Sequence, residues 1–417
     1  MMWWDERGVR GVEGRRGRVA VVDLDCEYTR RAVVEAFEGL EEGGWVVRVT
    51  EPREGEEGEE GEEEVTPVRG AHVYWGEYER IDWDSVGAGD VVANCYCIRK
   101  GLIRKAQLAL GVSKWRSKRP GSLLARCVPE THVFELYDIE YFDEVLIADV
   151  PELRDIKPED VWILKPNITN QALGVTVFND LDTLRSVLSS DEAWNLREWV
   201  VQRYVDRPLL VGGKKFHVRV YVLAVGAAPM TVYVHDDMLA LFAAETYRHA
   251  GGSGSVRELS DLGAHLTNTC RVASDGSMTE GEESGFVKLF DEIRDEIRVE
   301  GAKEGIRKVV GECFEAVSSD LSFMPLPNCF ELFGFDFMLD EDWGLWLLEA
   351  NAEPDFKQTG GRLNRIIGDA IKGVYDKAVA PLTGAARGTG NYDGTKWRKV
   401  YEKMVVSGSE AVGFQVV

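Results

Sequence analysis

Apolar residues recur along the chain with two periods, one typical of strands and one typical of helices. A short run of buried-strand type at 19–22 ends in acidic residues, and a helical spacing of apolar positions follows over 32–40. Gly43 and Gly44 stop the helical pattern, and the segment WVVRVT at 45–50 again has strand character. The fold is therefore predicted to begin with a β-α-β unit.

Strand and helix patterns continue over most of the remaining chain. Strands are predicted in AHVYWG, DVVANCYC, VWILKP, VTVF, WVVQRYV, FHVRVYVLAVG, MTVYVH, FELFGFDFML and GLWLLEAN. Helices are predicted near 182–189 and over 286–318, whereas the tail over 386–417 has little periodicity and is left unassigned. Residues 1–17 are rich in Arg and Gly and contain little that could pack, so we expect a mobile arm there. The mixture of elements predicts an α/β protein.

One segment is dominated by glutamate. Between residues 51 and 64, nine of fourteen residues are Glu and three are Gly. Such a segment repels itself and buries no apolar area, so it predicts a solvated loop inserted into the first domain. The alternative is an acidic decoy or partner-binding tail.

Length and charge narrow the function classes. A chain of 417 residues is long enough for two or three domains. Lys and Arg number 49 against 72 Asp and Glu, which gives a formal charge of −23. This charge argues against general binding to nucleic acid or anionic membranes, so an anionic ligand needs a local basic site.

Cysteine usage and the lack of long apolar runs indicate the compartment. The seven cysteines are odd in number and scattered, and Cys95 and Cys97 have one spacer residue where zinc and redox pairs usually have two. We expect a reduced, intracellular protein without a structural metal. No apolar run reaches the ~20 residues of a membrane helix, and the opening lacks the apolar segment of a signal peptide, so the expected location is the cytoplasm.

A basic segment interrupts this acidic chain. Residues 99–119 contain eight Lys or Arg and no acid. The segment is a candidate seat for phosphates or for an acidic peptide. Its apolar positions equally describe an ordinary amphipathic helix with a cationic face.

Two sets of charged residues occur within strand patterns. Lys215, His217 and Arg219 alternate along one strand and therefore share a face, which favours an anion site or pairing with acids. Glu349 and Asn351 share a face at a strand end, and Asp336 could join them from a neighbouring strand. Their oxygens suit Mg²⁺ that bridges nucleotide phosphates. The alternative is a buried ion pair with Lys215 or Arg219, but such a pair would not need Asn351.

Other polar residues near strand ends are weaker candidates. Lys165 lies at a strand end before a loop, a usual place for a phosphate or nucleobase contact. Gln202 could read an adenine edge while Tyr204 and Val205 offer their backbone, or it could be a hydrogen-bonded core glutamine. The segment HLTN at 265–268 is either a polar turn or a loop near phosphates.

Taken in order, these motifs resemble those of a known family. WILKP, WVVQRYV, KKFHVRVYVLAVG, HLTN and FELFGFDFMLDEDWGLWLLEANAEPDF are similar to motifs of the tubulin–tyrosine ligase-like branch of the ATP-grasp enzymes. The resemblance runs from about residue 103 to about residue 373. It implies a Rossmann-like domain at 18–102, a central ATP-grasp lobe at 103–203 and a C-terminal lobe at 204–385, with ATP held between the lobes.

The resemblance also implies roles for individual residues. The implied ATP contacts are Lys105, Lys165, Gln202, Tyr204, Val205 and Asn268. Lys215 and Arg219 match cations that hold the phosphoryl group and the acyl substrate. Asp336, Glu349 and Asn351 match the magnesium ligands, and Glu349 is counted with the catalytic residues.

Three positions depart from the family pattern. The loop after Lys165 keeps only Gly174 of the usual glycines, His217 stands where many members have an acid, and Leu241 stands where active ligases commonly have an arginine. The first hypothesis is a ligase that uses ATP and Mg²⁺ to join tyrosine or glutamate to a protein carboxylate, such as a tubulin tail or another acidic tail, through an acyl phosphate. The second is a catalytically weak ATP-binding relative that serves as a protein-interaction module. The third is an ATP-grasp ligase for small peptides or metabolites.

Overall fold

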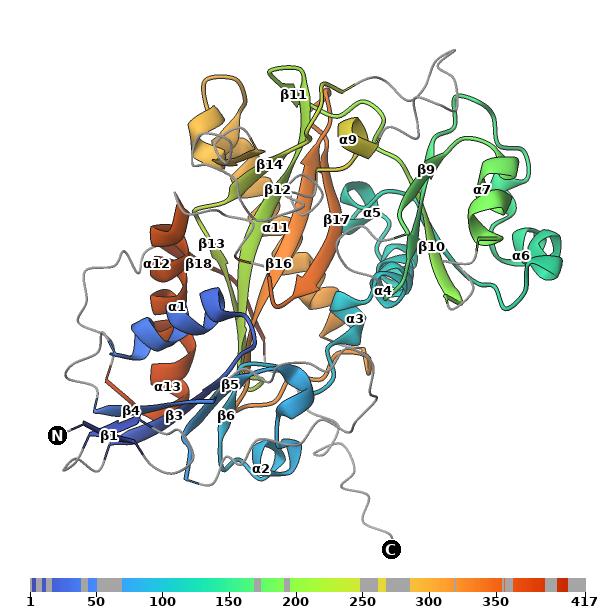
Figure 1. The fold of residues 1–417 in the computed structure, drawn as a ribbon. Helices are drawn as coiled ribbons and strands as arrows, with labels where there is room; N and C mark the ends of the chain where they lie inside the picture. The colour runs from blue at the N-terminus through green and yellow to red at the C-terminus, as the bar shows by residue number, and fades with distance from the viewer. Residues whose placement is uncertain are drawn as a thin grey trace, which may run out of the picture.

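The computed structural model describes residues 2–4, 10–12, 17–38, 44–50, 70–168, 174–190, 196–247, 262–267, 286–318, 320–354, 356, 363–386 and 396–403. Three sheets of four or more strands, a two-stranded sheet near the N-terminus and the surrounding helices form this part of the chain (Figure 1). The three larger sheets carry most of the fold. They are called below the N-terminal, central and large sheets. The acidic segment 51–64 lies outside the described residues.

The N-terminal sheet is parallel and has the strand order β4-β3-β5-β6. Its elements are β3 (Arg18–Asp23), α1 (Glu27–Glu38), β4 (Trp45–Val49), β5 (Val73–Gly76) and β6 (Val92–Ala93). The predicted β-α-β beginning is therefore present. A 3₁₀ turn (Tyr78–Arg80) and the short helix α2 (Trp83–Gly87) link β5 to β6.

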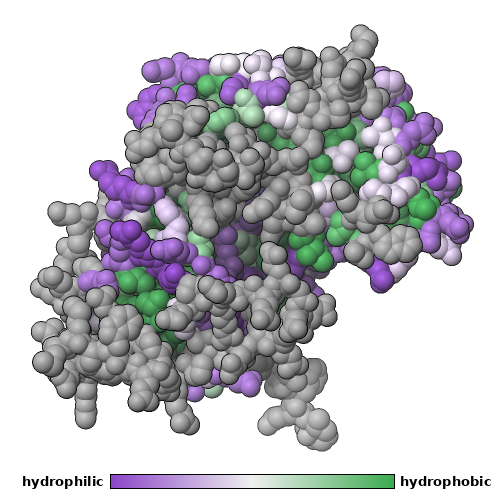
Figure 2. All heavy atoms as spheres, in the orientation of Figure 1, coloured by the Kyte–Doolittle hydropathy of each residue, from purple (hydrophilic) through white to green (hydrophobic). Residues whose placement is uncertain are grey.

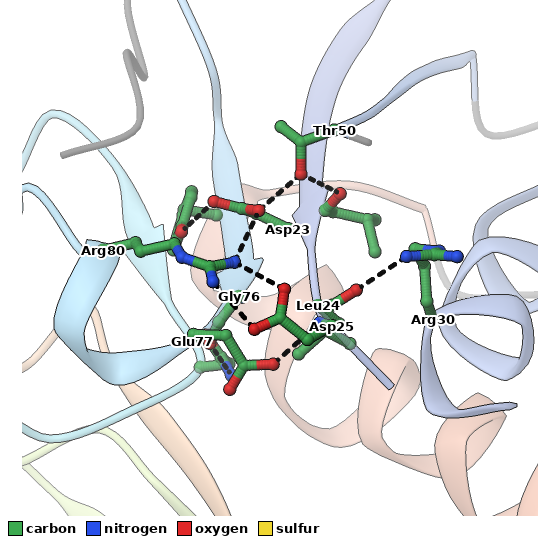
Figure 3. A network of polar contacts seen from close by, with 11 residues as sticks. Asp23, Leu24, Asp25, Arg30, Thr50, Gly76, Glu77 and Arg80 are labelled. Carbon is green, nitrogen blue, oxygen red and sulfur yellow. Dashed lines mark hydrogen bonds and ion pairs between the residues drawn. The ribbon is translucent and has the colours of Figure 1, made fainter. Parts of the chain in front are cut away.

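A polar network fastens the carboxyl ends of these strands (Figure 3). Arg80 donates to both oxygens of Asp25, at 2.9 and 2.7 Å, and lies 3.4 Å from Asp23. Thr50 and Tyr74 donate to the two oxygens of Asp23. Asp23 and Arg80 are buried, so each charge is compensated by the other within the domain.

The central sheet is antiparallel, with the order β7-β10-β8-β9. Its strands are β7 (Thr131–Glu135), β8 (Trp162–Pro166), β9 (Thr176–Phe178) and β10 (Glu198–Arg203). Helices α6 (Phe142–Asp149) and α7 (Leu181–Leu188) pack apolar residues on one face of the sheet. The 3₁₀ turns Ile139–Tyr141 and Pro151–Leu153 flank α6.

The large sheet has eight antiparallel strands, centred on the long strand β12 (Lys214–Val225). The others are β11 (Leu210–Val211), β13 (Met230–His235), β14 (Leu239–Phe242), β15 (Val287–Leu289), β16 (Phe330–Leu339), β17 (Leu345–Ala352) and β18 (Trp397–Lys403). Between β14 and β15 lies the short helix α9 (Leu262–His265).

Helices cover both faces of the large sheet. Helix α11 (Val299–Val317) packs on one face. On the other, α12 (Asn364–Val374), the π-helical turn Tyr375–Val379 and α13 (Ala380–Thr383) lie beside α1 (Figure 1). The N-terminal sheet contacts the large sheet just before β16, where the Ala93 N–H donates to the Asn328 carbonyl at 3.2 Å.

The basic segment forms two helices that break at Arg104, α3 (Lys100–Ile103) and α4 (Lys105–Lys118), and α5 (Leu124–Cys127) follows. Lys114 lies 3.1 Å from Asp320 and Arg119 lies 3.9 Å from Glu315. Part of the cationic face is thus used in ion pairs with the C-terminal half of the chain. Within the described ranges, no helix combines the length and the apolar character needed to span a membrane.

Several predicted elements differ from the structure. The helix predicted over 286–318 begins only at Val299; before it lie β15, which pairs with β14, and a 3₁₀ turn (Phe290–Ile293). The segment DVVANCYC contributes only two strand residues, since beyond Ala93 the chain turns to dock on the large sheet. Where a mobile arm was expected, β1 (Met2–Trp4) and β2 (Arg10–Val12) pair with each other. The unassigned tail supplies β18, which pairs with β13.

Candidate functional site

A cavity of about 450 Å³ lies between the central and large sheets and extends to the N-terminal sheet. It is lined by every predicted site residue that the structure describes, namely Lys105, Lys165, Gln202, Tyr204, Val205, Lys215, Arg219, Asp336, Glu349 and Asn351. Asn268 lies outside the described residues. In the space-filling view the molecule is hollowed near its centre (Figure 2). Six segments of the chain thus contribute to one site.

Strand alternation in β12 places the row of cations. Phe216 and Val218 pack into the core beneath α11, so Lys215, His217 and Arg219 face the cavity. All three are at least nine-tenths buried. Burial of three such groups requires partners, and each has a different one.

Arg219 is paired with Asp336, its cross-strand neighbour on β16. The Arg219 Nε donates to Asp336 Oδ1 at 2.5 Å and the second nitrogen donates to Oδ2 at 3.0 Å. Although burial opposes its charge, Asp336 raises the pKa of Arg219 above its usual value. At Gly334 a Cβ would lie 3.3 Å from Arg219 Cδ, so glycine gives the arginine room to reach along the strand. The buried ion pair between Asp336 and Arg219, given above as the alternative to a metal site, is thus formed in this structure.

A β-bulge in β17 aims Glu349 and Asn351 into the cavity. Asp336 is opposite Glu349, but the next residue, Phe337, is opposite Leu347. The extra residue changes the alternation, so that Leu347 enters the core while Glu349 and Asn351 line the cavity. Without the bulge, residues 347, 349 and 351 would all face the same side.

Glu349 is held as a carboxylate by its surroundings. Burial alone would raise its pKa, but the charges of Lys105 and Lys165 and a hydrogen bond from Asn351 lower the pKa to about 2. Lys105 Nζ lies 3.7 Å from Glu349 Oε2. Asn351 lines the same cavity, so two carboxylates and one amide oxygen are available as a donor set, which fits Mg²⁺. In the structure, the carboxylate of Asp336 is paired with Arg219 and that of Glu349 lies near Lys105.

Lys165 and Gln202 are diagonal neighbours on the paired strands β8 and β10, and Gln202 is opposite Thr131 of β7. Lys165 Nζ donates to Gln202 Oε1 at 2.9 Å, and Gln202 Nε2 donates to Thr131 Oγ1 at 3.0 Å. Both ends of the glutamine amide therefore have partners, as the core-glutamine alternative predicted. Burial lowers the pKa of Lys165 to about 8 despite the nearby charge of Glu349. This pKa lies about one pH unit above neutral, so Lys165 loses its proton within the mildly alkaline range.

Lys215 belongs to a second chain of contacts. Its Nζ donates to the Tyr204 hydroxyl at 2.6 Å, and that hydroxyl lies 2.9 Å from His265 Nδ1. Burial and the charge of Lys165 lower the pKa of Lys215 to about 7. Val205 follows Tyr204 on the cavity wall, and among the described residues its amide and carbonyl bond to no other backbone group. This leaves a backbone edge available to a planar ligand.

His217 has contacts that its sequence pattern did not reveal. Its Nδ1 and Thr267 Oγ1 share a hydrogen bond, while Nε2 lies 3.6 Å from Asp336 Oδ1. Burial lowers the pKa of His217, so the neutral ring is favoured. The HLTN motif thus reaches the cavity through His265 and Thr267.

The cavity continues past Asn351 to a mixed-charge end that the site prediction did not include. Arg99 pairs with Glu331 at 2.5 Å and with Glu353 at 3.2 Å. Arg104 and Glu79 also line this end. Glu353 has a left-handed backbone, with φ of 49°, a conformation that non-glycine residues adopt at a cost. The basic segment was the signal for Arg99 and Arg104, but nothing local marked the acids opposite them.

The departures from the family pattern lie in different surroundings. Leu241 is the cross-strand partner of His217 and is buried in an apolar cluster. Gly174 has φ of 70°, and a Cβ there would approach Pro166 to 2.8 Å, so this glycine is required by the backbone. The rest of the loop before Gly174, residues 169–173, lies outside the described part of the chain.

A second group of potential metal ligands lies on the central sheet. Within the described ranges, Glu130, His132 and Glu152 form the one set of three such groups whose ligand atoms lie within 4.8 Å of one another. The two His132 nitrogens face different carboxylates, at 3.3 and 3.5 Å, and Arg203 also approaches Glu130. These contacts describe a surface ion-pair cluster.

Comparisons with known proteins agree with this arrangement. The family model described as "Tubulin-tyrosine ligase family" matches residues 113–385. The chain is 33% identical to a probable tubulin–tyrosine ligase of Schizosaccharomyces pombe, over 75% of this chain and 83% of that protein. It is 31% identical to the probable tubulin–tyrosine ligase PBY1 of Saccharomyces cerevisiae, of which it spans 46%. The crystal structure of the C-terminal domain of Kluyveromyces lactis Pby1, described as an ATP-grasp enzyme interacting with the mRNA decapping enzyme Dcp2, matches with a TM-score of 0.64 and 29% identity, over 92% of this chain and 98% of that one.

Proposed function

Because the chain belongs to the tubulin-tyrosine ligase family and has the ATP-grasp fold, we propose that it is an ATP-dependent carboxylate–amine ligase. Its reaction would join an amino acid, tyrosine or glutamate, to a carboxylate of a protein. The observation that carries the proposal is the single cavity in which separate segments bring four cations to two carboxylates and an amide. Such a combination suits a phosphate chain with a divalent cation.

The cavity walls suggest how ATP lies. The backbone edge at Val205, which bonds to no other backbone group in the described part of the chain, suits the nucleobase beside Tyr204. Gln202 already has partners at both ends of its amide, so an adenine contact would require it to exchange one of them. The phosphates would then extend toward Lys105, Lys165 and Arg219.

The chemistry follows from charge neutralisation. The acceptor carboxylate would attack the γ-phosphorus, giving an acyl phosphate and ADP, and the amino group of the added amino acid would then displace phosphate to form the amide. Lys165, Lys215 and Arg219 would hold the negative charge that spreads over the transferring group. Asp336, Glu349 and Asn351 would hold Mg²⁺, which would supply positive charge against that of the phosphates.

The acceptor and the compartment are inferred from charge and cysteine chemistry. Arg116 and Lys118 on α4 leave positive charge on an otherwise acidic protein, which suits an acidic protein tail such as that of tubulin. The described cysteines are all unbonded, which agrees with action in the reducing cytoplasm. Relatives of the chain are named as tubulin ligases and polyglutamylases.

The test is ATP-dependent incorporation of labelled tyrosine and glutamate into purified tubulin and into cell lysate. Glu349→Gln should abolish incorporation and remove most of the thermal stabilisation by Mg–ATP, which should be about 2.7 kcal/mol for wild type at ~100 times the dissociation constant. Glu341→Gln, in the turn between β16 and β17 and outside the cavity, is the matched control and should keep both. An unchanged thermal shift in Glu349→Gln would refute the proposed metal site.

A second function is favoured by one observation, the burial of Leu241 in an apolar cluster where active ligases commonly have an arginine. The chain would then bind ATP but act as a protein-interaction module, as the partner named for the Kluyveromyces relative suggests. ATP binding without incorporation into tubulin, lysate proteins or small peptides selects this function. Incorporation into small peptides alone selects a small-substrate ligase.

A further inference from the structure

His217 is a buried polar side chain with an unused nitrogen. It is 2% exposed and lines the cavity between Lys215 and Arg219. Its Nδ1 is bonded to Thr267, whereas Nε2 has no hydrogen-bond partner among the described residues. A buried polar atom without a partner costs roughly 1–3 kcal/mol, so a ligand that satisfies it gains by binding there.

Nε2 lies close to an oxygen that could bind the metal. It lies 3.6 Å from Asp336 Oδ1, an oxygen of the proposed magnesium site. Neighbouring ligand atoms that are each about 2.1 Å from one octahedral ion are about 3.0 Å apart, so an approach of about 0.6 Å would bring Nε2 and Oδ1 to this separation. Asp336 Oδ1 accepts one hydrogen bond from Arg219 and retains a second lone pair for the ion.

The hydrogen bond at Nδ1 supports this role. Histidines that bind metals almost always use their other ring nitrogen in a hydrogen bond, which fixes the ring orientation. Thr267 provides that bond here, and the core beneath β12 holds the backbone of His217 on both sides. The ring is therefore already oriented before a metal arrives.

We propose that His217 ligates the nucleotide-bound divalent cation and gives the site a preference for Mn²⁺ or Co²⁺ over Mg²⁺. Imidazole nitrogen binds first-row transition ions well, whereas Mg²⁺ is held by oxygen. With His217 as a ligand, the donor set would contain an imidazole nitrogen beside the oxygens of Asp336, Glu349 and Asn351. The inference rests on the proposed nucleotide site but not on turnover.

The experiment measures metal and nucleotide binding directly. Purified protein is titrated with ADP in the presence of Mn²⁺ or Mg²⁺ by calorimetry, and the Mn²⁺–ADP complex is examined by electron spin-echo spectroscopy for modulation from a histidine nitrogen. His217→Asp replaces nitrogen by oxygen, and His235→Gln removes another buried histidine outside the cavity as the matched control.

Wild type and His235→Gln should show the nitrogen modulation, and His217→Asp should lose it. The ratio of Mg²⁺–ADP to Mn²⁺–ADP dissociation constants should fall about tenfold in His217→Asp, mainly through weaker Mn²⁺ binding. Retained Mg²⁺–ADP binding by His217→Asp shows that the variant site is folded. Equal ratios in all three proteins, with no nitrogen signal in wild type, would overturn the inference and leave His217 as a support for Thr267. Failure of ADP to bind with either metal would instead overturn the proposed function, and the inference with it.

Discussion

Nucleotide affinity should fall steeply as pH rises from 7 to 9, because the phosphates need two lysines whose pKa values in the protein without nucleotide lie near this range. Burial lowers the pKa of Lys165 to about 8, and burial with the charge of Lys165 lowers that of Lys215 to about 7. A bound phosphate favours the charged form and raises both pKa values. Binding therefore takes up protons, and affinity is lost as pH rises through the pKa values that the two lysines have without nucleotide.

The size of the effect follows from these two pKa values. From pH 7 to pH 9 the protonated fraction of Lys165 falls about tenfold, and that of Lys215 falls about fiftyfold. If both lysines stay charged in the complex, affinity should fall by up to several hundredfold. A contact made by Lys165 alone would limit the loss to about tenfold.

The assay is calorimetric titration of the protein with a non-hydrolysable ATP analogue at saturating Mg²⁺ from pH 7 to pH 9, repeated in buffers with different ionisation enthalpies to count protons. Lys165→Met and Lys215→Met should each flatten the pH dependence and remove part of the proton uptake. Lys214→Met is the matched control, since Lys214 is on the same strand but donates to the Ala244 carbonyl outside the cavity. Affinity that stays within twofold over this range, without proton uptake, would refute the reasoning.

The cation row and the acidic groups were predictable because strand alternation is a local rule. Residues 215, 217 and 219 share a face in any straight strand, and the apolar residues between them indicate that the opposite face packs into the hydrophobic core. The structure lines the cavity with all three. Which acid each cation pairs with was harder to predict from the sequence. Arg219 pairs with Asp336 because the strand register places these residues side by side, although they are more than a hundred positions apart.

The bulge in β17 shows why strand patterns alone could not give the complete geometry. A single strand contains Leu347, Glu349 and Asn351 at equal spacing, yet the first enters the core and the others enter the cavity. The register of β16 against β17 decides this, and no local composition marks the extra residue.

Tertiary pairing also explains the wrong helix prediction over 286–298. Apolar residues at 287, 290, 293 and 297 have helical spacing, but the structure uses the first of them in β15 and the next in a 3₁₀ turn. Pairing with β14 outweighs the local pattern. Strand β18 was missed for the same reason, since its partner β13 lies far away in the sequence.

Two further variants test the N-terminal sheet and the basic helix. Arg80→Met should lower the free energy of unfolding by about 3 kcal/mol in urea denaturation, because it leaves the carboxylate of Asp23 buried without its cation; adding Asp23→Asn should recover part of this, and equal stability of both variants would contradict the account. Reversal of Arg116 and Lys118 to Glu should weaken binding of a glutamate-rich peptide at low salt, with the difference shrinking as salt screens the charges. Lys114 is left unchanged, since it pairs with Asp320 and its reversal would disturb the packing of α4. Mg–ADP affinity should stay the same, because both positions lie outside the cavity. Equal peptide affinities for wild type and variant at low salt would show that this face is solvated surface and that the acceptor enters elsewhere.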